Sequence, residues 1–203
     1  MHKKRTAILI SGRGSNMGAL ISAGQTEDYP AEIVLVVSNR PHASGLAIAQ
    51  AAGIATKIVD HIAYEDRVAF DAELDEVLRA HGIDLVCLAG FLRMLTPKFV
   101  EKWRGRIINV HPALLPQFKG LDTHARALAA GVKTHGATVH FVSAEIDSGP
   151  IIMQASVPVH SDDTEEALAA RVLAEEHRIY PAALRLVAEG QVSIDGAIPS
   201  ESE

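Results

Sequence analysis

The chain has 203 residues, of which 48% are hydrophobic and 22% are charged, and its formal net charge at pH 7 is -6. This composition excludes a disordered or fibrous protein, and the length suits one large domain. The negative charge, without a stripe of lysine or arginine, excludes a nucleic-acid-binding surface, because affinity for a phosphate backbone comes from clustered positive charge. A phosphorylated small molecule is still allowed, since a few backbone N–H groups can hold one phosphate.

The first five residues are charged like the start of a secretory signal, but the apolar run that follows ends at Ser11, too early for export. No apolar stretch of the sequence is long enough to cross a bilayer, and the single Cys87 can form no internal disulfide. We therefore expect a cytoplasmic protein without a membrane partner. The sequence leaves its oligomeric state open.

A glycine-rich loop, residues 11–16 (SGRGSN), follows the first predicted strand and opens the first helix. Backbone N–H groups and the helix dipole bind anions at such a place. The loop is not a dinucleotide fingerprint, because Met17 stands where the third glycine should be and the second strand ends at residues 38–40 without an acidic ribose ligand. The alternative is a tight turn that binds nothing, since Ser15 and Asn16 are also good capping residues.

Short apolar runs alternate with helical patterns through the first half of the chain. Runs rich in Val, Ile and Leu predict strands at residues 6–10, 33–37, 56–59, 85–88 and 106–110. Strands buried on both faces belong to a parallel sheet, and repeated βαβ units have right-handed crossovers. The clearest helix between them spans residues 66–81 and ends at Gly82. Its apolar stripe consists of Phe70, Leu74, Val77 and Leu78.

Asn109 and His111 lie two residues apart at the end of the fifth predicted strand, so their side chains share a face. Pro112 ends that strand, which places both at the carboxyl end of a parallel strand, where open α/β sheets bind ligands. An amide N–H beside an imidazole can stabilise an oxyanion, and Asp147 can orient the imidazole and favour its charged form. The alternative is an Asn and a His that only cap the next segment.

The pattern changes after Gly136. Residues 137–142 and 151–159 predict two strands without a helix between them, joined by the turn-rich residues 146–150, so we expect an antiparallel pair. A long helix is expected to begin near Asp163 with Glu166 in a capping box, and Pro181 to kink or end it. The predicted fold class is α/β, a Rossmann-like open, mostly parallel twisted sheet flanked by helices, with an antiparallel C-terminal part, in a single domain over residues 1–203.

Other chemistry finds less support in the sequence. There is no Gly-x-Ser-x-Gly elbow, and Cys87 lies in a predicted core strand. His135 and His140 show no metal-ligand spacing, so we expect them to be scattered surface or core histidines and predict no metal. Glu176 falls on the apolar stripe of the long helix, where a carboxylate needs a partner. It either occupies an edge with a solvated head or contacts a polar or cationic substrate group.

Four segments closely resemble the phosphoribosylglycinamide formyltransferases, a family of folate-dependent enzymes, in order and in spacing. They are residues 11–16 (SGRGSN), 88–95 (LAGFLRML), 108–116 (INVHPALLP) and 146–150 (IDSGP). The resemblance extends to residues 175–181 and covers nearly the whole chain. It implies that 10-formyltetrahydrofolate, as co-substrate, donates its formyl group to the glycinamide amine of a ribonucleotide in de novo purine biosynthesis, with Asn109, His111 and Asp147 as catalytic residues.

The resemblance also implies binding residues and a division of the domain. Gly14, Ser15 and Asn16 would hold the ribose phosphate, and Glu176 would meet the glycinamide substrate. Residues 1–110 would be the phosphate-binding βα half, and residues 111–203 the catalytic and folate-closing half. At Leu173 the chain departs from the family pattern, which often has glutamine there, so that contact is not transferred. The implied folate-binding residues are Arg67, Leu92, Arg93, Met94, Leu95, Asn109, Ser143, Ala144, Glu145, Ile146 and Asp147.

The expected reaction is direct transfer, in which the uncharged amine attacks the formyl carbon while Asn109 and protonated His111 stabilise the oxyanion. Relatives with the same three residues formylate methionyl-tRNA or nucleotide sugars, or hydrolyse formylfolate. The tRNA enzyme would be expected to carry an added basic C-terminal domain and the hydrolase an added N-terminal domain, for which we expect no room. Outside this class, the alternatives are a nucleotide-binding regulator that lost the chemistry and an NADP-dependent reductase using Arg40.

Overall fold

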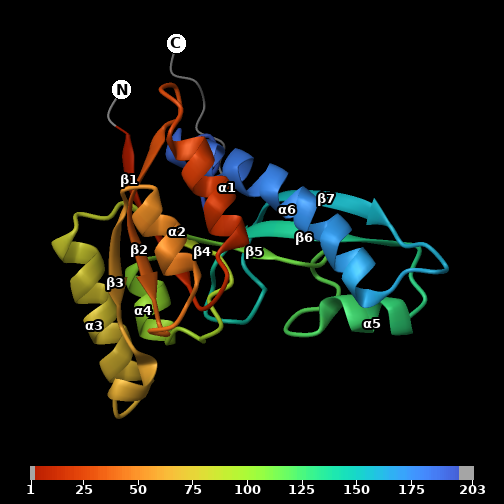
Figure 1. Ribbon diagram of the computed structural model, residues 1–203, viewed down its shortest axis with the longest axis horizontal. Coiled ribbons are helices and arrows are strands. Elements are labelled where there is room, and N and C mark those ends of the chain that lie inside the picture. Colours follow the sequence, from red (N-terminus) through yellow and green to blue (C-terminus); the bar gives the residue numbers. More distant parts are fainter. Residues whose placement is uncertain (1–2, 197–203) are drawn as a thin grey trace.

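The computed structural model describes residues 3–196 (Figure 1), so residues 1–2 of the charged start and residues 197–203 of the expected domain lie outside the described residues. Its strands form one open sheet in the order β3-β2-β1-β4-β5-β6-β7. The first five pair in parallel, whereas β6 pairs antiparallel with both β5 and β7. This confirms the predicted fold class. The strands are β1 (Lys4–Ile10), β2 (Ala31–Ser38), β3 (Ala55–Ile58), β4 (Leu85–Leu88), β5 (Ile107–His111), β6 (Thr134–Phe141) and β7 (Ile151–Pro158).

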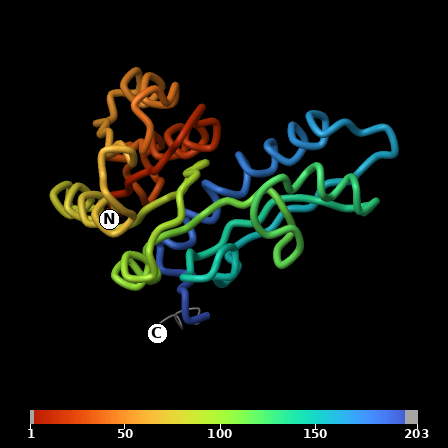
Figure 2. Tube along the Cα trace, turned by 90° about the horizontal axis from the view of Figure 1, so that it is seen from below, coloured from red at the N-terminus to blue at the C-terminus, as the bar shows by residue number. Residues whose placement is uncertain are grey.

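Helices cover both faces of the sheet. They are α1 (Ser15–Gly24), α2 (Gly45–Ala51), α3 (Arg67–Ala80), α4 (Pro97–Lys102), α5 (Thr123–Ala129) and α6 (Glu165–Ala188), with a short 3-10 helix η1 (His61–Ala63). The prediction for α3 is confirmed: the Asp66 side chain accepts a hydrogen bond from the backbone N–H of Ala69, and Gly82 follows the helix with a φ of 62°. Figures 1 and 2 show the long helix α6 running along β6 and β7.

Side-chain alternation along β1 divides the core in two. Ala7 and Leu9 belong to the apolar cluster that includes α3 and α4, whereas Ile8 and Ile10 belong to the cluster beneath α1, α2 and α6. All four side chains are fully buried, because a central strand of a parallel sheet has helices on both faces. The sheet is therefore a rigid base on which the loops at its carboxyl edge are held.

The expected capping box of α6 is wrong, and so is the expectation that Pro181 ends the helix, whereas a kink at Pro181 stays a prediction. Its N-cap is Thr164, whose hydroxyl accepts a hydrogen bond from the N–H of Ala167, while Asp163 instead forms an ion pair with Arg171 at 2.8 Å. Pro181 does not end the helix, which continues to Ala188. The ring removes one helical N–H donor, but Tyr180, Ala183 and Leu184 are packed in the core, and this burial holds the helix through the proline.

Strand β6 begins at Thr134, before the start expected from Gly136. Gly136 lies inside the strand. The residue is glycine there because a Cβ atom would come within 2.0 Å of the carbonyl oxygen of Ala155 on β7. The glycine allows close approach of the two strands rather than marking a boundary between segments.

Candidate active site

Asn109 and His111 lie at the carboxyl end of β5, directly before Pro112. The intervening Val110 and the preceding Ile108 point into the core beneath α6, so Asn109 and His111 point to the other face, as predicted. In the antiparallel pairing of β5 with β6, Asn109 lies opposite His140. The structure therefore places a second histidine beside the two predicted residues.

Asp147 lies in the loop between β6 and β7, with a φ of 47°. Its Oδ2 atom is 3.4 Å from Nδ1 of His111, and its Oδ1 atom is 3.7 Å from Nε2 of His140. The carboxylate thus lies between two imidazole rings. Gly149 makes this loop possible, because a Cβ atom at that position would come within 1.8 Å of the carbonyl oxygen of Phe141. Asp147, which is far from Asn109 and His111 in the sequence, therefore lies beside them in the structure.

The loop before α5 holds both His111 and Asp147. Nε2 of His111 lies 2.9 Å from the carbonyl oxygen of Phe118, and the backbone N–H of Gly120 donates to Oδ2 of Asp147 at 2.9 Å. The Lys119 ammonium donates to the Ser148 hydroxyl at 2.5 Å, which ties the same loop to the one between β6 and β7. No local sequence pattern predicts this loop, because its contacts are made mostly by backbone atoms.

His111 and His140 are both buried, with 5% and 2% of their surface exposed. Burial lowers the pKa of His140, and the positive charge of His111 adds to this, while the nearby Asp147 opposes it. His140 is therefore neutral at pH 7. The sequence predicts an ordinary surface or core histidine at this position, because the strand register that brings His140 next to Asn109 is not encoded in a local pattern.

The glycine loop has the form expected of an anion site. Gly14 precedes α1 with a φ of 73°, and no side chain caps the first turn of this ten-residue helix. A Cβ atom on Gly14 would lie 2.8 Å from Met17 and 3.2 Å from the backbone of Gly45. Only glycine therefore fits here, and the N–H groups of the first helical turn, which begins with Ser15 and Asn16, have no side-chain partner at the cap.

Asn16 and Glu176 meet, although 160 residues separate them in the sequence. The Asn16 amide donates to Oε2 of Glu176 at 2.5 Å, and both side chains are buried. Burial raises the pKa of Glu176, which the bond from Asn16 and the charge of His111 partly oppose. A solvated edge position for Glu176 is therefore wrong. Oδ1 of Asn16 has no partner among the described residues, and a buried acceptor of this kind suits a ligand donor.

The segment after β4 is linked to the glycine loop. The Ser11 hydroxyl accepts a hydrogen bond from the N–H of Leu92 at 2.8 Å and donates to Oδ1 of Asn39 at 2.5 Å. Leu92 and Met94 are 62% and 51% exposed, which is unusual for large apolar side chains. Leu95 is partly buried in the cluster beneath α3.

Two arginines among the predicted folate residues differ in surroundings. The Arg93 guanidinium lies 4.5 Å from the centre of the Phe70 ring, and its buried Nε has no partner among the described residues. Arg67 lies exposed in the first turn of α3, and its charge acts on Asp71.

Before Asp147, residues 143–146 make few contacts with the rest of the protein, one of which is the ion pair of Glu145 with Lys119 at 3.7 Å. The Ser143 hydroxyl donates to the carbonyl oxygen of Glu145 at 2.9 Å, and Ala144 lies between them. The side chains of Glu145 and Ile146 are exposed. Ile146 is a third large apolar side chain on a loop at this edge of the sheet.

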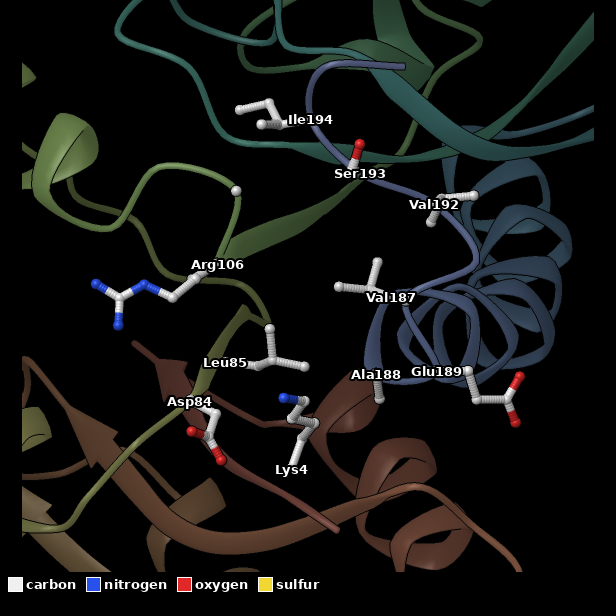
Figure 3. A pocket seen from close by; sticks show the side chains of 12 residues that line it. Lys4, Asp84, Leu85, Arg106, Val187, Ala188, Glu189, Val192, Ser193 and Ile194 are labelled. Carbon is white, nitrogen blue, oxygen red and sulfur yellow. The ribbon is translucent and has the colours of Figure 1, made fainter. Parts of the chain in front are cut away.

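A hollow of about 440 Å³ lies at the opposite edge of the sheet (Figure 3). Lys4 and Arg106 line it, together with apolar residues around the C-terminal end of α6. Arg106 stacks on Trp103 at 4.2 Å and donates to the carbonyl oxygen of Lys102. Asp84 and Glu189 also line this hollow. We place the candidate active site at the carboxyl edge, where Asn109, His111 and Asp147 meet.

Among the described residues there is neither a helix that could span a membrane nor a cluster of side chains that could hold a metal ion. No helix within residues 3–196 is both long and apolar enough to cross a membrane. In the same part of the chain, no three His, Cys, Asp or Glu side chains are grouped so that they could hold a metal ion.

Comparison with known proteins gives consistent results. The family described as "Formyl transferase" matches residues 4–184. The phosphoribosylglycinamide formyltransferase of Escherichia coli K12 is 44% identical over 92% of this chain and 88% of its own length. The trifunctional purine biosynthetic protein adenosine-3 of Gallus gallus is 50% identical over 97% of this chain, which spans only 20% of that relative's length.

Solved structures agree with these sequence matches. The crystal structure of glycinamide ribonucleotide transformylase 1 from Symbiobacterium toebii has a TM-score of 0.91 and 49% identity, covering 94% of this chain and 90% of that one. The phosphoribosylglycinamide formyltransferase from Brucella melitensis has a TM-score of 0.89 and 50% identity, covering 93% and 97% of the two chains.

Proposed function

The chain belongs to the formyl transferase family, and we propose that it is a formyltransferase of purine biosynthesis in which Asn109, His111 and Asp147 catalyse transfer of the formyl group of 10-formyltetrahydrofolate to the amine of phosphoribosylglycinamide. The observation that carries this assignment is the approach of Asp147 to within 3.4 Å of His111, on the face of β5 that also carries Asn109. The cytoplasmic location expected from the sequence stays a prediction.

In this proposal the folate supplies the formyl group, and the protein stabilises charge. As the uncharged amine attacks the formyl carbon, negative charge develops on the formyl oxygen, which the Asn109 amide and the His111 imidazolium neutralise. Collapse of this intermediate breaks the bond between the formyl carbon and N10 of the folate, and N10 gains the proton that the attacking nitrogen loses, so tetrahydrofolate leaves. Both ring nitrogens of His111 face acceptors, Asp147 and the carbonyl of Phe118, and a doubly protonated ring satisfies both. To donate a hydrogen bond to the formyl oxygen, Nε2 of His111 must give up its hydrogen bond to the carbonyl oxygen of Phe118. The positive charge of the imidazolium stabilises the oxyanion whether or not this exchange has taken place.

Phosphate binding is assigned to Gly14, Ser15 and Asn16, because a helix that begins without a side-chain cap leaves N–H donors for an anion. Glu176 is assigned to the acceptor substrate. Its link to Asn16 and its electrostatic interaction with His111 support a path for the substrate from the glycine loop to the catalytic histidine. In this scheme residues 1–110 hold the phosphate and residues 111–203 contribute the catalytic and folate-closing parts.

Folate binding is assigned to the two loops that expose apolar side chains at the same edge. Leu92, Met94 and Ile146 are each about half exposed or more, and a flat aromatic ligand would cover them. Arg93 and Leu95 border the same segment, Arg67 lies at the start of α3, and Asp147 closes the loop that contains Ser143, Ala144 and Glu145.

The test measures release of tetrahydrofolate by the purified protein with and without glycinamide ribonucleotide. We expect turnover only when the acceptor is present, whereas equal release without the acceptor would identify a hydrolase. Asp147→Asn should lower kcat about 100-fold or more and leave the melting temperature nearly unchanged, because the variant keeps the shape and loses the charge. Asp122→Asn, an exposed aspartate in the neighbouring loop, is the matched control and should keep wild-type kcat.

A further inference from the structure

His140 is the buried titratable group closest to the proposed catalytic residues that has no role in the mechanism above. It extends from β6 opposite Asn109, and its ring is 2% exposed. Nδ1 lies 2.9 Å from the carbonyl oxygen of Phe141, and Nε2 lies 3.2 Å from Nδ2 of Asn109. The two ring nitrogens therefore face different partners, one of which can only accept a hydrogen bond.

These contacts fix the tautomer of His140. A carbonyl oxygen is an acceptor, so Nδ1 must carry the hydrogen that it donates to Phe141. In a neutral ring Nε2 then carries a lone pair, and the nearest donor to it is the Asn109 amide nitrogen. The opposite tautomer would direct the Nδ1 lone pair at the Phe141 carbonyl oxygen and leave Nε2–H facing Asp147 at 3.7 Å, beyond hydrogen-bond distance.

The tautomer in turn determines how the Asn109 amide is oriented. One N–H of Nδ2 donates to His140, so the amide nitrogen, and not its oxygen, faces the β6 side. The amide has a second N–H on the same nitrogen, which stays available for another acceptor. A flipped amide would direct its oxygen at the Nε2 lone pair, and the two acceptors would repel each other.

We propose that His140 is a positioning residue that orients the Asn109 amide, so that its second N–H is directed at the developing formyl oxygen. This inference rests on the proposed function, because it concerns the same transfer reaction. His140 acts through Asn109 and contacts no reacting atom. His140 and His111 lie on either side of the Asp147 carboxylate, and His140 is the neutral ring of the two.

Two substitutions separate the hydrogen bonds of His140. Asparagine places an amide near the position of Nδ1, which keeps the bond to Phe141 but does not reach Asn109. Glutamine places its Oε1 near the position of Nε2, which restores an acceptor for Asn109. We expect His140→Asn to lower kcat about 10- to 100-fold with both KM values unchanged, and His140→Gln to recover kcat to within a few-fold of wild type.

A double-mutant cycle tests whether the effect passes through Asn109. In the Asn109→Ala background, His140→Asn should cause no further loss of kcat, because there is no amide left to orient. Losses that multiply in the double variant would show an independent role and overturn the inference, as would wild-type kcat in His140→Asn alone. Melting temperatures of all variants identify any loss that comes from unfolding.

A second measurement does not depend on turnover. Nitrogen-15 NMR of the imidazole in the wild-type protein at pH 7 should show a protonated Nδ1 and an unprotonated Nε2 for His140. An Nε2–H tautomer would overturn the inference even if the protein is fully active. A wild-type protein that transfers no formyl group would instead overturn the proposed function, and the inference with it.

Discussion

Burial keeps His135 neutral near the candidate site. Its ring packs edge-on against Phe118 and His124, with centroid distances of 5.7 Å and 5.3 Å, and it is almost fully buried. Burial lowers the pKa of His135 to about 4 from its ordinary 6.5, and the charge of His124 adds to this. Because the His135 ring contacts Phe118, whose carbonyl oxygen lies 2.9 Å from Nε2 of His111, protonation of His135 would disturb the loop that holds the proposed catalytic histidine.

His135 therefore makes the free energy of unfolding depend on pH. The unfolded chain binds a proton at His135 below about pH 6.5, whereas the folded protein does so only near pH 4, so protons favour the unfolded state. The free energy of unfolding should fall as the pH falls through this window. In His135→Phe, urea unfolding at pH 7 and pH 5 should show a smaller fall than in wild type. The exposed His42→Gln serves as control, and an equal fall in His135→Phe and wild type would contradict the prediction.

At this scale the sequence was sufficient for some residues and not for others. The position of Asn109 and His111 on one face followed from strand alternation and from Pro112. The place of His140 depended on the pairing register between β5 and β6, which no local pattern encodes. The roles assigned to the binding residues remain predictions, and the structure adds the bond between Asn16 and Glu176.

At the scale of elements, glycines divide into those that permit close packing and those that do not. A Cβ atom at Gly136 would lie 2.0 Å from the Ala155 carbonyl oxygen on β7, whereas one at Gly18 in α1 would have nothing within 4 Å. The first is a backbone clash, and the second is an open position in a helix.

Gly136→Ala should lower the free energy of unfolding by about 2 kcal/mol or more, because β6 and β7 must separate to admit the methyl group. Gly18→Ala should instead raise it by about 0.5–1 kcal/mol, through the better helix propensity of alanine. Chemical denaturation of both variants checks the prediction. Similar stabilities for the two would mean that β6 and β7 are not as closely packed as described.

Element boundaries show where sequence patterns were insufficient. The apolar periodicity of α3 and its Asp66 and Gly82 ends were enough to predict it. Pro181 misled the prediction for α6, because the breaking effect of proline is local, whereas the burial that holds the helix comes from β-strands and α1 far away in the sequence. Gly136 likewise led to a wrong start for β6, because the residue that requires glycine there, Ala155, lies on β7 and not in the neighbouring sequence.

At the scale of the whole molecule, α6 joins parts of the chain that are distant in sequence. The buried Tyr180 hydroxyl lies 2.9 Å from the carbonyl oxygen of Leu88 at the end of β4 and 3.1 Å from that of Ile108 on β5. One helical turn earlier, Glu176 meets the glycine loop. One residue after Tyr180, the carbonyl oxygen of Pro181 accepts a hydrogen bond from the Tyr29 hydroxyl at 2.7 Å.

Tyr180→Phe should lower the free energy of unfolding by about 1–2 kcal/mol, through the loss of a buried hydrogen bond, and raise the KM for the ribonucleotide several-fold by loosening the turn that carries Glu176. Tyr29→Phe also removes a hydroxyl bonded to α6, and should lower stability similarly while leaving that KM unchanged. Denaturation curves and steady-state kinetics of both variants distinguish the two effects. Equal KM values in both variants would contradict the role given to α6.

The bond between Asn16 and Glu176 has a consequence for a chain emerging from the ribosome. The glycine loop leaves the exit tunnel early, but its partner on α6 is translated 160 residues later. Until then Asn16 lacks its hydrogen bond to Glu176, and the nucleotide pocket that we propose lacks the side that α6 forms. A nascent chain that does not yet contain α6 is therefore expected to be unable to bind the acceptor that we propose, and the capacity to bind should arise only after α6 has been translated and has docked.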